Sequence, residues 1–142
     1  MRAIILAALS LLLFPAFEAS AQPRRTLLDT GAAGRVVAVP QPRGEHEEAL
    51  RLLRAGRTVW QAGAQRFAPF RDGSPIPIGA GETAIGITGW TGGAYCCWTL
   101  HLFHRGAQGL AHVASLPLGK REPDIIRLAP PGGTSGSGSS AG

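Results

Sequence analysis

A pair of glycines between two apolar runs constrains the fold of this chain more than any other feature. Gly92 and Gly93 separate "TAIGITGW" and its trailing threonine from "AYCCWTLHLF". Adjacent glycines accept the positive φ of a two-residue hairpin turn, and runs rich in β-branched and aromatic residues favour strands. Residues 83–116 are therefore predicted to form an antiparallel hairpin, which a second turn at "RGAQG" extends into a three-stranded meander.

Counting outward from the glycines predicts the register of the hairpin. The predicted pairs are Thr91 with Ala94, Trp90 with Tyr95, Gly89 with Cys96, Thr88 with Cys97, Ile87 with Trp98, and Ile85 with Leu100. Because side chains alternate across a strand, one face is predicted to be an apolar core face of Ile85, Ile87, Cys96, Trp98, Leu100 and Leu102. The opposite face would be mixed and would carry Thr88, Trp90, Tyr95, Cys97, Thr99, His101 and Phe103. That mixed face would be either a contact surface or covered by a second sheet or by residues 47–62.

The rest of the chain divides into segments of different composition. Residues 22–34 read as an irregular lead-in, and Arg35–Val39 as a short strand closed by prolines. Residues 63–82 contain recurring Gly and Pro and are predicted to be loop. Residues 129–142 are a Pro/Gly/Ser tail with the composition of disordered chain. A single β-rich domain is thus expected over residues 35–128.

Two local structures fit the segment that follows the first predicted strand. "EHEEALRLLRAG" has acids at its start and arginines towards its end, with Gly56 as a C-cap, and this pattern favours a short helix over residues 45–55. "ALRLLRAGRTVWQA" also fits two strands joined at Ala55-Gly56. Local signals alone favour the helix. In either case the predicted fold is mainly β: a single small antiparallel β domain, arranged as a meander, as a propeller-like blade or as a sandwich.

The first residues predict export. Arg2 precedes an apolar run from Ala3 to Phe14, and Ala19-Ser20-Ala21 is a small-x-small cleavage site. This is the pattern of a secretory signal peptide over residues 1–21, with cleavage after Ala21. The run is too short to be a membrane span. The mature chain is therefore expected to be periplasmic or secreted, in an oxidising compartment.

The positive charge of the chain does not indicate a nucleic-acid partner. The formal net charge is +5, but the basic residues are scattered and no run of like charges is long enough to mark a nucleic-acid arm. An envelope protein or a small ligand is the expected partner, with no membrane span. No catalytic residue and no cofactor is assigned, because no Gly-x-Ser-x-Gly elbow and no paired carboxylates around a histidine occur.

The adjacent cysteines have several readings. On a regular strand Cys96 and Cys97 point to opposite faces, and His101 lies about 13 Å along the strand from Cys97. One metal ion cannot bridge that distance, and no thiol–imidazole pair closes over it. Two buried thiols that pack as small hydrophobic groups are the favoured interpretation. A disulfide between the neighbours is the covalent alternative, and it would interrupt the strand.

The glycine–cysteine stretch also resembles a known group of sequences. "GITGWTGGAYCCWTLHLFHRG" with the trailing "LAHVASLPLG" is similar to exported bacterial proteins that carry a Trp-Thr/Ser-Gly-Gly-Ala-His-Cys-Cys stretch. The resemblance covers residues 83–118, and Tyr95 stands where the group usually has His. The group looks related to FG-GAP/VCBS-type β repeats, which implies an antiparallel β architecture and favours the hairpin over the helix at residues 47–62. The resemblance implies no activity.

These observations together lead to a functional expectation. The chain is expected to be an exported, non-catalytic β-rich binding or structural module of the cell envelope. The alternative is a thiol- or redox-active or metal-binding periplasmic protein that uses Cys96 and Cys97. The candidate contact residues are Trp90, Gly92, Gly93, Tyr95, Cys96, Cys97, Thr99 and His101.

Overall fold

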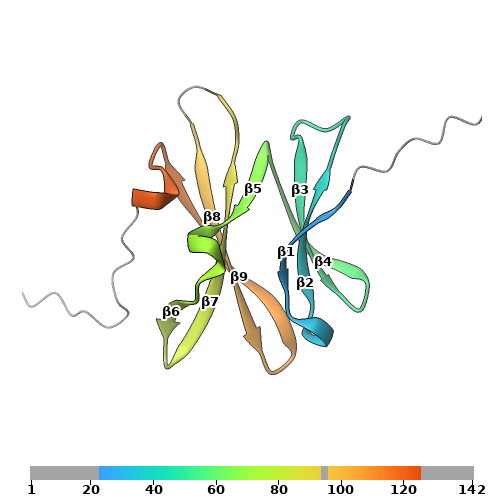
Figure 1. The fold of residues 1–142 in the computed structure, drawn as a ribbon, viewed down its shortest axis with the longest axis vertical. Coiled ribbons are helices and arrows are strands. Elements are labelled where there is room, and N and C mark those ends of the chain that lie inside the picture. Colours follow the sequence, from blue (N-terminus) through green and yellow to red (C-terminus); the bar gives the residue numbers. More distant parts are fainter. Residues whose placement is uncertain (1–22, 94–95, 126–142) are drawn as a thin grey trace, which may run out of the picture.

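Two antiparallel sheets face each other in a computed structural model that describes residues 23–93 and 96–125 (Figure 1). The first sheet has the strand order β1-β2-β3-β4, and the second has the order β5-β7-β8-β9, with β6 paired to β7 as well. The strands β1 to β4 form one antiparallel meander and β7 to β9 form another, whereas β5 and β6 both pair with β7. The prediction of a small, mainly β antiparallel domain is confirmed, and the arrangement of the sheets is that of a sandwich.

The strands follow the chain with short connections. They are β1 (Arg25–Asp29), β2 (Arg35–Pro40), β3 (Glu48–Arg54), β4 (Arg57–Ala64), β5 (Arg66–Pro69), β6 (Ile76–Gly79), β7 (Glu82–Trp90), β8 (Trp98–Gly106) and β9 (Gly109–Gly119). Three 3-10 turns, η1 (Gly31–Ala33), η2 (Phe70–Gly73) and η3 (Pro123–Ile125), complete the described secondary structure. In the described part of the chain, no helix combines the length and the hydropathy needed to cross a membrane. The predicted signal peptide (1–21) and the tail (129–142) lie outside the described residues.

Two segments that the sequence predicts to be irregular contain strands. Within the expected lead-in, residues 22–34, β1 pairs with β2 and its Leu28 packs against the core. Within the expected loop, residues 63–82, β5 and β6 pair with successive halves of β7. These strands are only four or five residues long, and β5 and β6 each bury a single side chain, Phe67 and Ile76. Such short strands have too few alternating residues for periodicity to reveal them.

Residues 45–62, for which both a helix and a pair of strands fit the sequence, form a hairpin. β3 and β4 pair about Ala55 and Gly56, whose φ angles are +48° and +74°. The short helix predicted over residues 45–55 is wrong, and the hairpin that the resemblance implied is present. β3 is an interior strand between β2 and β4, and its Leu50 and Leu52 face the second sheet. Burial between two sheets, which local propensity does not represent, determines the structure here.

The register of the β7–β8 hairpin differs from the predicted one. Trp90 pairs with Trp98, and Ile87 pairs with His101 instead of Trp98. The connection is therefore the seven-residue loop 91–97 and not a two-residue turn at Gly92-Gly93, although both glycines have positive φ, +86° and +89°. Since the shift is an odd number of residues, it exchanges the faces on which the β8 side chains lie relative to those of β7.

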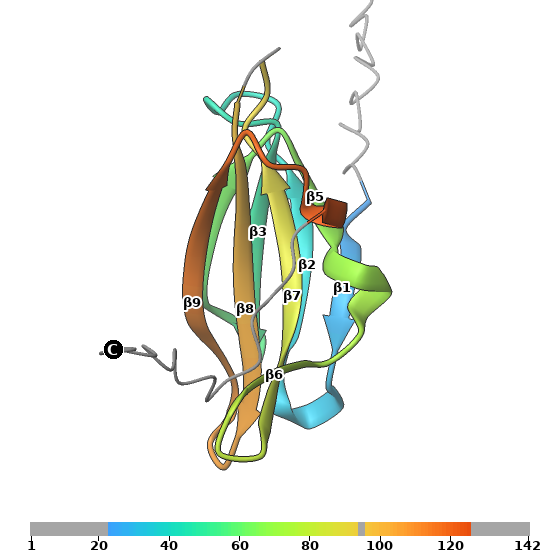
Figure 2. The same cartoon turned by 90° about the vertical axis from the view of Figure 1, so that its left-hand side faces the viewer.

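The observed register buries both faces of the second sheet. On the inner face, Ile87 and Phe103 pack with residues of the first sheet, among them Val36, Leu50 and Leu52. On the outer face, Leu100 and Leu102 pack under Phe70 of η2 and Ile76 of β6, the segment that crosses this face in Figure 2. The predicted grouping of Ile85 and Ile87 with Leu100 on one face is therefore wrong. The sequence predicted one core face, whereas β8 contributes to two cores.

The turn at Ala55 provides a test of the hairpin. A turn with positive φ at both central residues prefers Asn-Gly, because Asn tolerates this conformation better than Ala. We expect Ala55→Asn to raise the free energy of unfolding by about 0.5 kcal/mol, measured by urea denaturation. Ala107→Asn is the matched control, since Ala107 lies in the β8–β9 turn and is not among the residues with positive φ. Destabilisation by Ala55→Asn alone would contradict the turn conformation.

Candidate binding site at the loop end of the sandwich

Three connections meet at one end of the sandwich. They are the β2–β3 loop (41–47), Gln65 between β4 and β5, and the β7–β8 loop (91–97); Figures 1 and 2 both place the first and the last at the same end. The connections surround an open depression of about 860 Å³. It is lined by Pro40, Gln41, Pro42, Gly44, Glu45, His46, Glu47, Glu48, Gln65, Arg66, Trp90, Gly92 and Gly93. We refer to this region as the loop-end depression.

Backbone hydrogen bonds fix the shape of the depression. The Gln41 N–H donates to the Glu47 carbonyl at 2.7 Å and closes the β2–β3 loop, which the prolines and glycine of "PQPRG" begin. The Gln65 N–H donates to the Trp90 carbonyl at 2.7 Å, which joins the β4–β5 connection to the end of β7. A Cβ atom at Gly92 would lie 2.6 Å from Cγ of Gln65, so the two loops approach too closely there for a larger residue.

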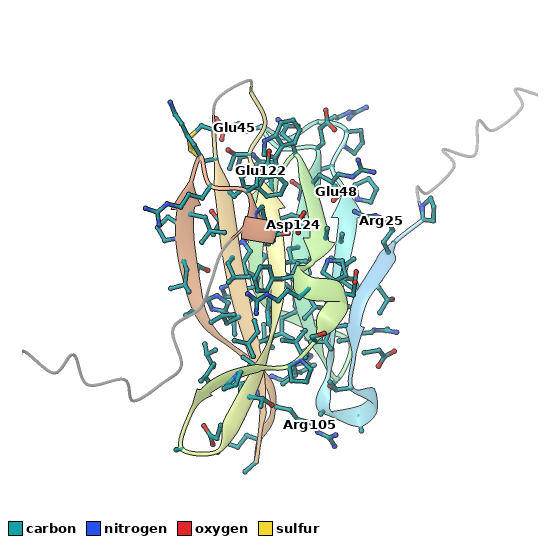
Figure 3. The ribbon with its side chains drawn as sticks, turned by 60° about the vertical axis from the view of Figure 1, so that its left-hand side comes forward. Arg25, Glu45, Glu48, Arg105, Glu122 and Asp124 are labelled. Atoms are coloured by element: carbon teal, nitrogen blue, oxygen red, sulfur yellow. A yellow bond between two sulfur atoms is a disulfide. The ribbon has the colours of Figure 1, made fainter. Side chains whose placement is uncertain are left out.

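The acidic stretch at residues 45–48 supplies both the rim and the base of the depression. Glu45 and Glu47 are exposed, whereas the Glu48 carboxylate is largely buried. Glu48 accepts hydrogen bonds from Nη2 of Arg25 at 2.6 and 2.8 Å and from the Phe67 N–H at 2.9 Å. Arg25 lies on β1 and Phe67 on β5, so one carboxylate connects the edges of both sheets (Figure 3). Glu48 is thus a structural residue, and Glu45 and Glu47 are solvated.

The two cysteines lie in the loop and are joined to each other. Cys96 and Cys97 form a disulfide between adjacent residues, and β8 begins only at the next residue, Trp98. Thr91 holds the loop against the strand: its Oγ1 accepts from the Cys97 N–H at 2.9 Å and donates to the Cys97 carbonyl at 3.1 Å. Cys96 is exposed. The favoured interpretation, two buried thiols on an unbroken strand, is therefore wrong, and the covalent alternative describes the structure.

Two tryptophans flank the disulfide loop. Trp90 ends β7 and Trp98 begins β8; their ring centroids are 6.4 Å apart, and the ring planes are tilted by 34°. Both side chains are half-buried. Paired aromatic rings at the base of a loop add stability beyond their buried area. The loop therefore rises from a rigid base formed by the last cross-strand pair of the sheet.

The candidate contact residues do not form a single surface. Trp90, Gly92, Gly93, Cys96 and Cys97 belong to the loop end, and Tyr95 lies outside the described residues. Thr99 is half-buried one residue into β8, and His101 is only 5% exposed between the sheets. The mixed face at His101 and Phe103 is thus covered by the first sheet, including Trp60 of the segment 47–62, and is not a contact surface.

The buried histidine belongs to a cluster that the sequence did not predict. Oγ of Ser115 lies 2.8 Å from Nδ1 of His101 and 2.8 Å from Nε2 of His112. Because a hydroxyl carries one proton and two lone pairs, Ser115 donates to at most one of the two imidazoles, and the tautomers of His101 and His112 set the direction of each hydrogen bond. Trp60 stacks on His112 with centroids 4.1 Å apart and meets the edge of His101. β9 has a bulge where it faces Leu102 and Phe103 of β8, and this bulge places His112 and Ser115 on the same side of the strand. No pattern in the sequence indicates the bulge.

The surroundings of this cluster oppose protonation. Burial, and to a smaller extent the neighbouring His112, lower the pKa of His101 from 6.5 to about 4. Burial also lowers the pKa of His112. Both imidazoles are therefore neutral at pH 7, which suits a pair that shares one hydroxyl group. Within the described residues, no group of three or more His, Cys, Asp or Glu side chains is placed to hold a metal ion.

The histidine cluster makes stability dependent on pH. A His whose pKa is lower in the folded state binds protons more readily when unfolded, so stability is lost as the pH falls from 6.5 towards 4. Between pH 7 and pH 5 we expect His101 to account for a loss of about 2 kcal/mol in the free energy of unfolding. His101→Gln should flatten this dependence. Urea denaturation at the two pH values measures the difference, and parallel curves for wild type and His101→Gln would contradict the assignment.

The disulfide predicts the number of free thiols. The described structure leaves neither cysteine free, so we expect no maleimide labelling of the oxidised protein, whether folded or denatured. Denaturation with reductant should release two thiols, and Cys96→Ala or Cys97→Ala should each leave one without reductant. Mass spectrometry of the labelled chain gives the count. Labelling of the wild type in denaturant alone would restore the two-thiol interpretation.

Comparison with known proteins adds no further assignment. No protein family matches the chain, and no curated protein or solved structure is similar enough to be reported as a match. The resemblance of residues 83–118 to exported proteins with a Gly-Gly-Ala-x-Cys-Cys stretch therefore stays a prediction. The site must be interpreted from its own geometry.

Proposed function

We propose that this chain is an exported, non-catalytic binding module of the cell envelope and that it binds through its loop-end depression. The observation that carries the proposal is the convergence of three connections around one open depression beside the exposed Cys96. Loops held by a rigid β scaffold are where binding residues are concentrated in many folds. The partner is an envelope protein or a small ligand that contacts the exposed rim.

The character of the rim favours binding over catalysis. Glu45, Glu47, Arg66 and Gly93 line the depression and are exposed. Water reaches such groups freely, whereas catalytic groups act most strongly in sites from which water is excluded. Gln41 and Gln65 add amide groups that can donate and accept hydrogen bonds. These groups suit the recognition of a polar partner.

The predicted export supports the envelope proposal by a separate argument. The predicted signal peptide, residues 1–21, would deliver the chain to an oxidising compartment, where a disulfide such as Cys96–Cys97 persists. Disulfides are rare in reducing compartments. The pattern of the first residues and the pairing of the cysteines therefore favour the same location.

One experiment tests both export and binding. The full chain is expressed in a Gram-negative host, and the protein recovered from the periplasm is expected to begin at Gln22 by N-terminal sequencing. It is then sedimented with peptidoglycan sacculi and with outer-membrane fragments. We expect saturable binding to one of the two fractions, weakened about tenfold by the double substitution Glu45→Ala/Glu47→Ala, because rim contacts would be lost.

A matched double substitution controls for charge. Glu82→Ala/Glu122→Ala removes the same two charges from residues that do not line the depression, and it should bind like the wild type. Equal weakening by both double variants would indicate a diffuse charge effect and would overturn the loop-end assignment. Absence of binding to both fractions would overturn the proposal that the partner is a fixed component of the envelope, such as an envelope protein.

The alternative function, thiol or redox activity at Cys96 and Cys97, is favoured by the exposure of Cys96. A dithiol reductant could attack this sulfur and form a mixed disulfide, then close its own disulfide and release both cysteine thiols. The labelling of both cysteines after dithiothreitol treatment of the folded protein, without denaturant, would support this alternative. Resistance of the folded protein to the reductant would count against it.

A further inference from the structure

The outer face of the first sheet carries a second, smaller depression that is distinct from the loop end. Its volume is about 240 Å³, and it is lined by Arg24, Arg35, Val37, Val39, Arg51, Leu53, Gly56 and Thr58. The strand register explains why these residues meet. Val37 of β2 pairs with Arg51 of β3 on one side and with Thr26 of β1 on the other, and Arg35 pairs with Leu53. Arg35 and Arg51 are therefore diagonal neighbours on the same face.

The three arginines that line this depression have no ion-pair partner among the described residues. None of the residues that line this depression is acidic. The acidic residue nearest by register is Asp29, opposite Arg35, and its Oδ1 accepts the Gly31 N–H at 2.8 Å. Among the described residues, no ion pair joins Arg24, Arg35 or Arg51 to an acid. Like charges on neighbouring strands destabilise a sheet unless an opposite charge compensates them.

One of the arginines also has a buried donor without a partner. Nε of Arg51 is inaccessible to solvent and makes no hydrogen bond, and it is the one such side-chain atom in the described part of the chain. A buried N–H without an acceptor costs free energy, so an unpaired one in a native structure calls for a physical explanation. An acceptor supplied by a bound anion would provide that explanation.

We propose that this depression binds an oxyanion, a phosphate-type group whose oxygens accept hydrogen bonds from the guanidinium of Arg51. The Nε and one Nη of arginine form a planar fork that matches two oxygens of such a group. Arg24 and Arg35 are exposed, so their side chains can move aside to admit the anion and then lie against its remaining oxygens. Val37 and Val39 contribute apolar side chains to the lining, and apolar walls that limit the access of water strengthen electrostatic attraction.

The proposal is independent of the loop-end function. The two depressions share no lining residue. The oxyanion could be free in solution or belong to a lipid headgroup, and both sources present the same phosphate oxygens to Arg51. The experiment therefore uses a separate probe for each source.

Arginine side-chain NMR follows the donor itself. The mature protein labelled with ¹⁵N is titrated with inorganic phosphate while the Nε–Hε signals of its arginines are recorded. We expect a saturable shift of the Arg51 signal, because its Hε acquires an acceptor. Arg51→Lys keeps the charge but removes the Nε–H fork, so it should weaken phosphate binding about tenfold or more, followed through the signals of the other arginines. Arg105→Lys, a matched substitution on β8 of the other sheet (Figure 3), should not change the affinity.

A second arm uses lipid vesicles and separates the two sources. Vesicles of phosphatidylcholine with and without phosphatidylglycerol are tested by co-sedimentation at fixed salt. Binding to the anionic vesicles that Arg51→Lys weakens and Arg105→Lys does not would assign the oxyanion to a lipid headgroup. A response to inorganic phosphate without vesicle binding would assign it to a free anion.

Two outcomes overturn the proposal. The first is an Arg51 Nε–Hε signal that does not shift with phosphate when vesicle binding is also absent. The second is equal weakening by Arg51→Lys and Arg105→Lys, which would indicate attraction by net charge alone. Should Arg51→Lys unfold the protein, Arg35→Gln replaces it, because Arg35 is exposed and its loss should weaken phosphate binding without loss of thermal stability.

Discussion

The burial of both faces of β7 and β8 is the constraint on which the rest of the structure depends. Their inner face meets the first sheet through Ile87 and Phe103, and their outer face lies under Phe70 and Ile76. A one-residue slip of either strand would move each of these side chains to the wrong layer. The register is therefore fixed from two sides. It in turn fixes where the strands end, at Trp90 and Trp98, and which residues remain for the loop.

Two glycines make this close packing feasible. A Cβ at Gly86 would lie 2.9 Å from Cδ1 of Leu100 on the outer side, and one at Gly89 would lie 2.7 Å from Cε1 of Phe67 on the inner side. Each glycine thus admits a large side chain of a neighbouring strand close to the β7 backbone. Glycine in a strand is usually unfavourable. Here its cost is offset by the burial of Leu100 and Phe67, both of which are fully buried.

The same scaffold separates the two candidate sites physically. The loop-end depression draws on connections from both sheets, and Glu48 connects the edges of those sheets just beneath it. The arginine depression lies on the outer face of the first sheet alone. The chain carries a formal charge of +5, yet the exposed rim of the loop end includes Glu45 and Glu47 whereas the outer face gathers Arg24, Arg35 and Arg51. The uneven distribution of charge follows from strand alternation. Because neighbouring side chains point to opposite faces of the sheet, Arg35 and Arg51 lie on the outer face, while Val36 and Leu52 lie on the inner face.

Residue types along the chain were sufficient to predict the β class, the meander over residues 83–116 and the position of the β8–β9 turn. These follow from residue types and glycine positions, which act locally. The sequence also supplied both candidates for residues 45–62 and for the cysteines, but its local signals favoured the wrong one in each case. A helix start at "EHEE" and an unbroken strand through Cys96 and Cys97 satisfy local rules.

The choice between these alternatives depends on contacts between residues that are distant in sequence. β3 is a strand because it lies between β2 and β4 with Leu50 and Leu52 against the other sheet. The cysteines lie in a loop because Trp90 pairs with Trp98 and Thr91 holds Cys97. His101 is a buried residue because Trp60 and Phe67 cover it. The partners of each element are separated from it by tens of residues, and no local pattern of charge or hydrophobicity represents which sheet will cover which face.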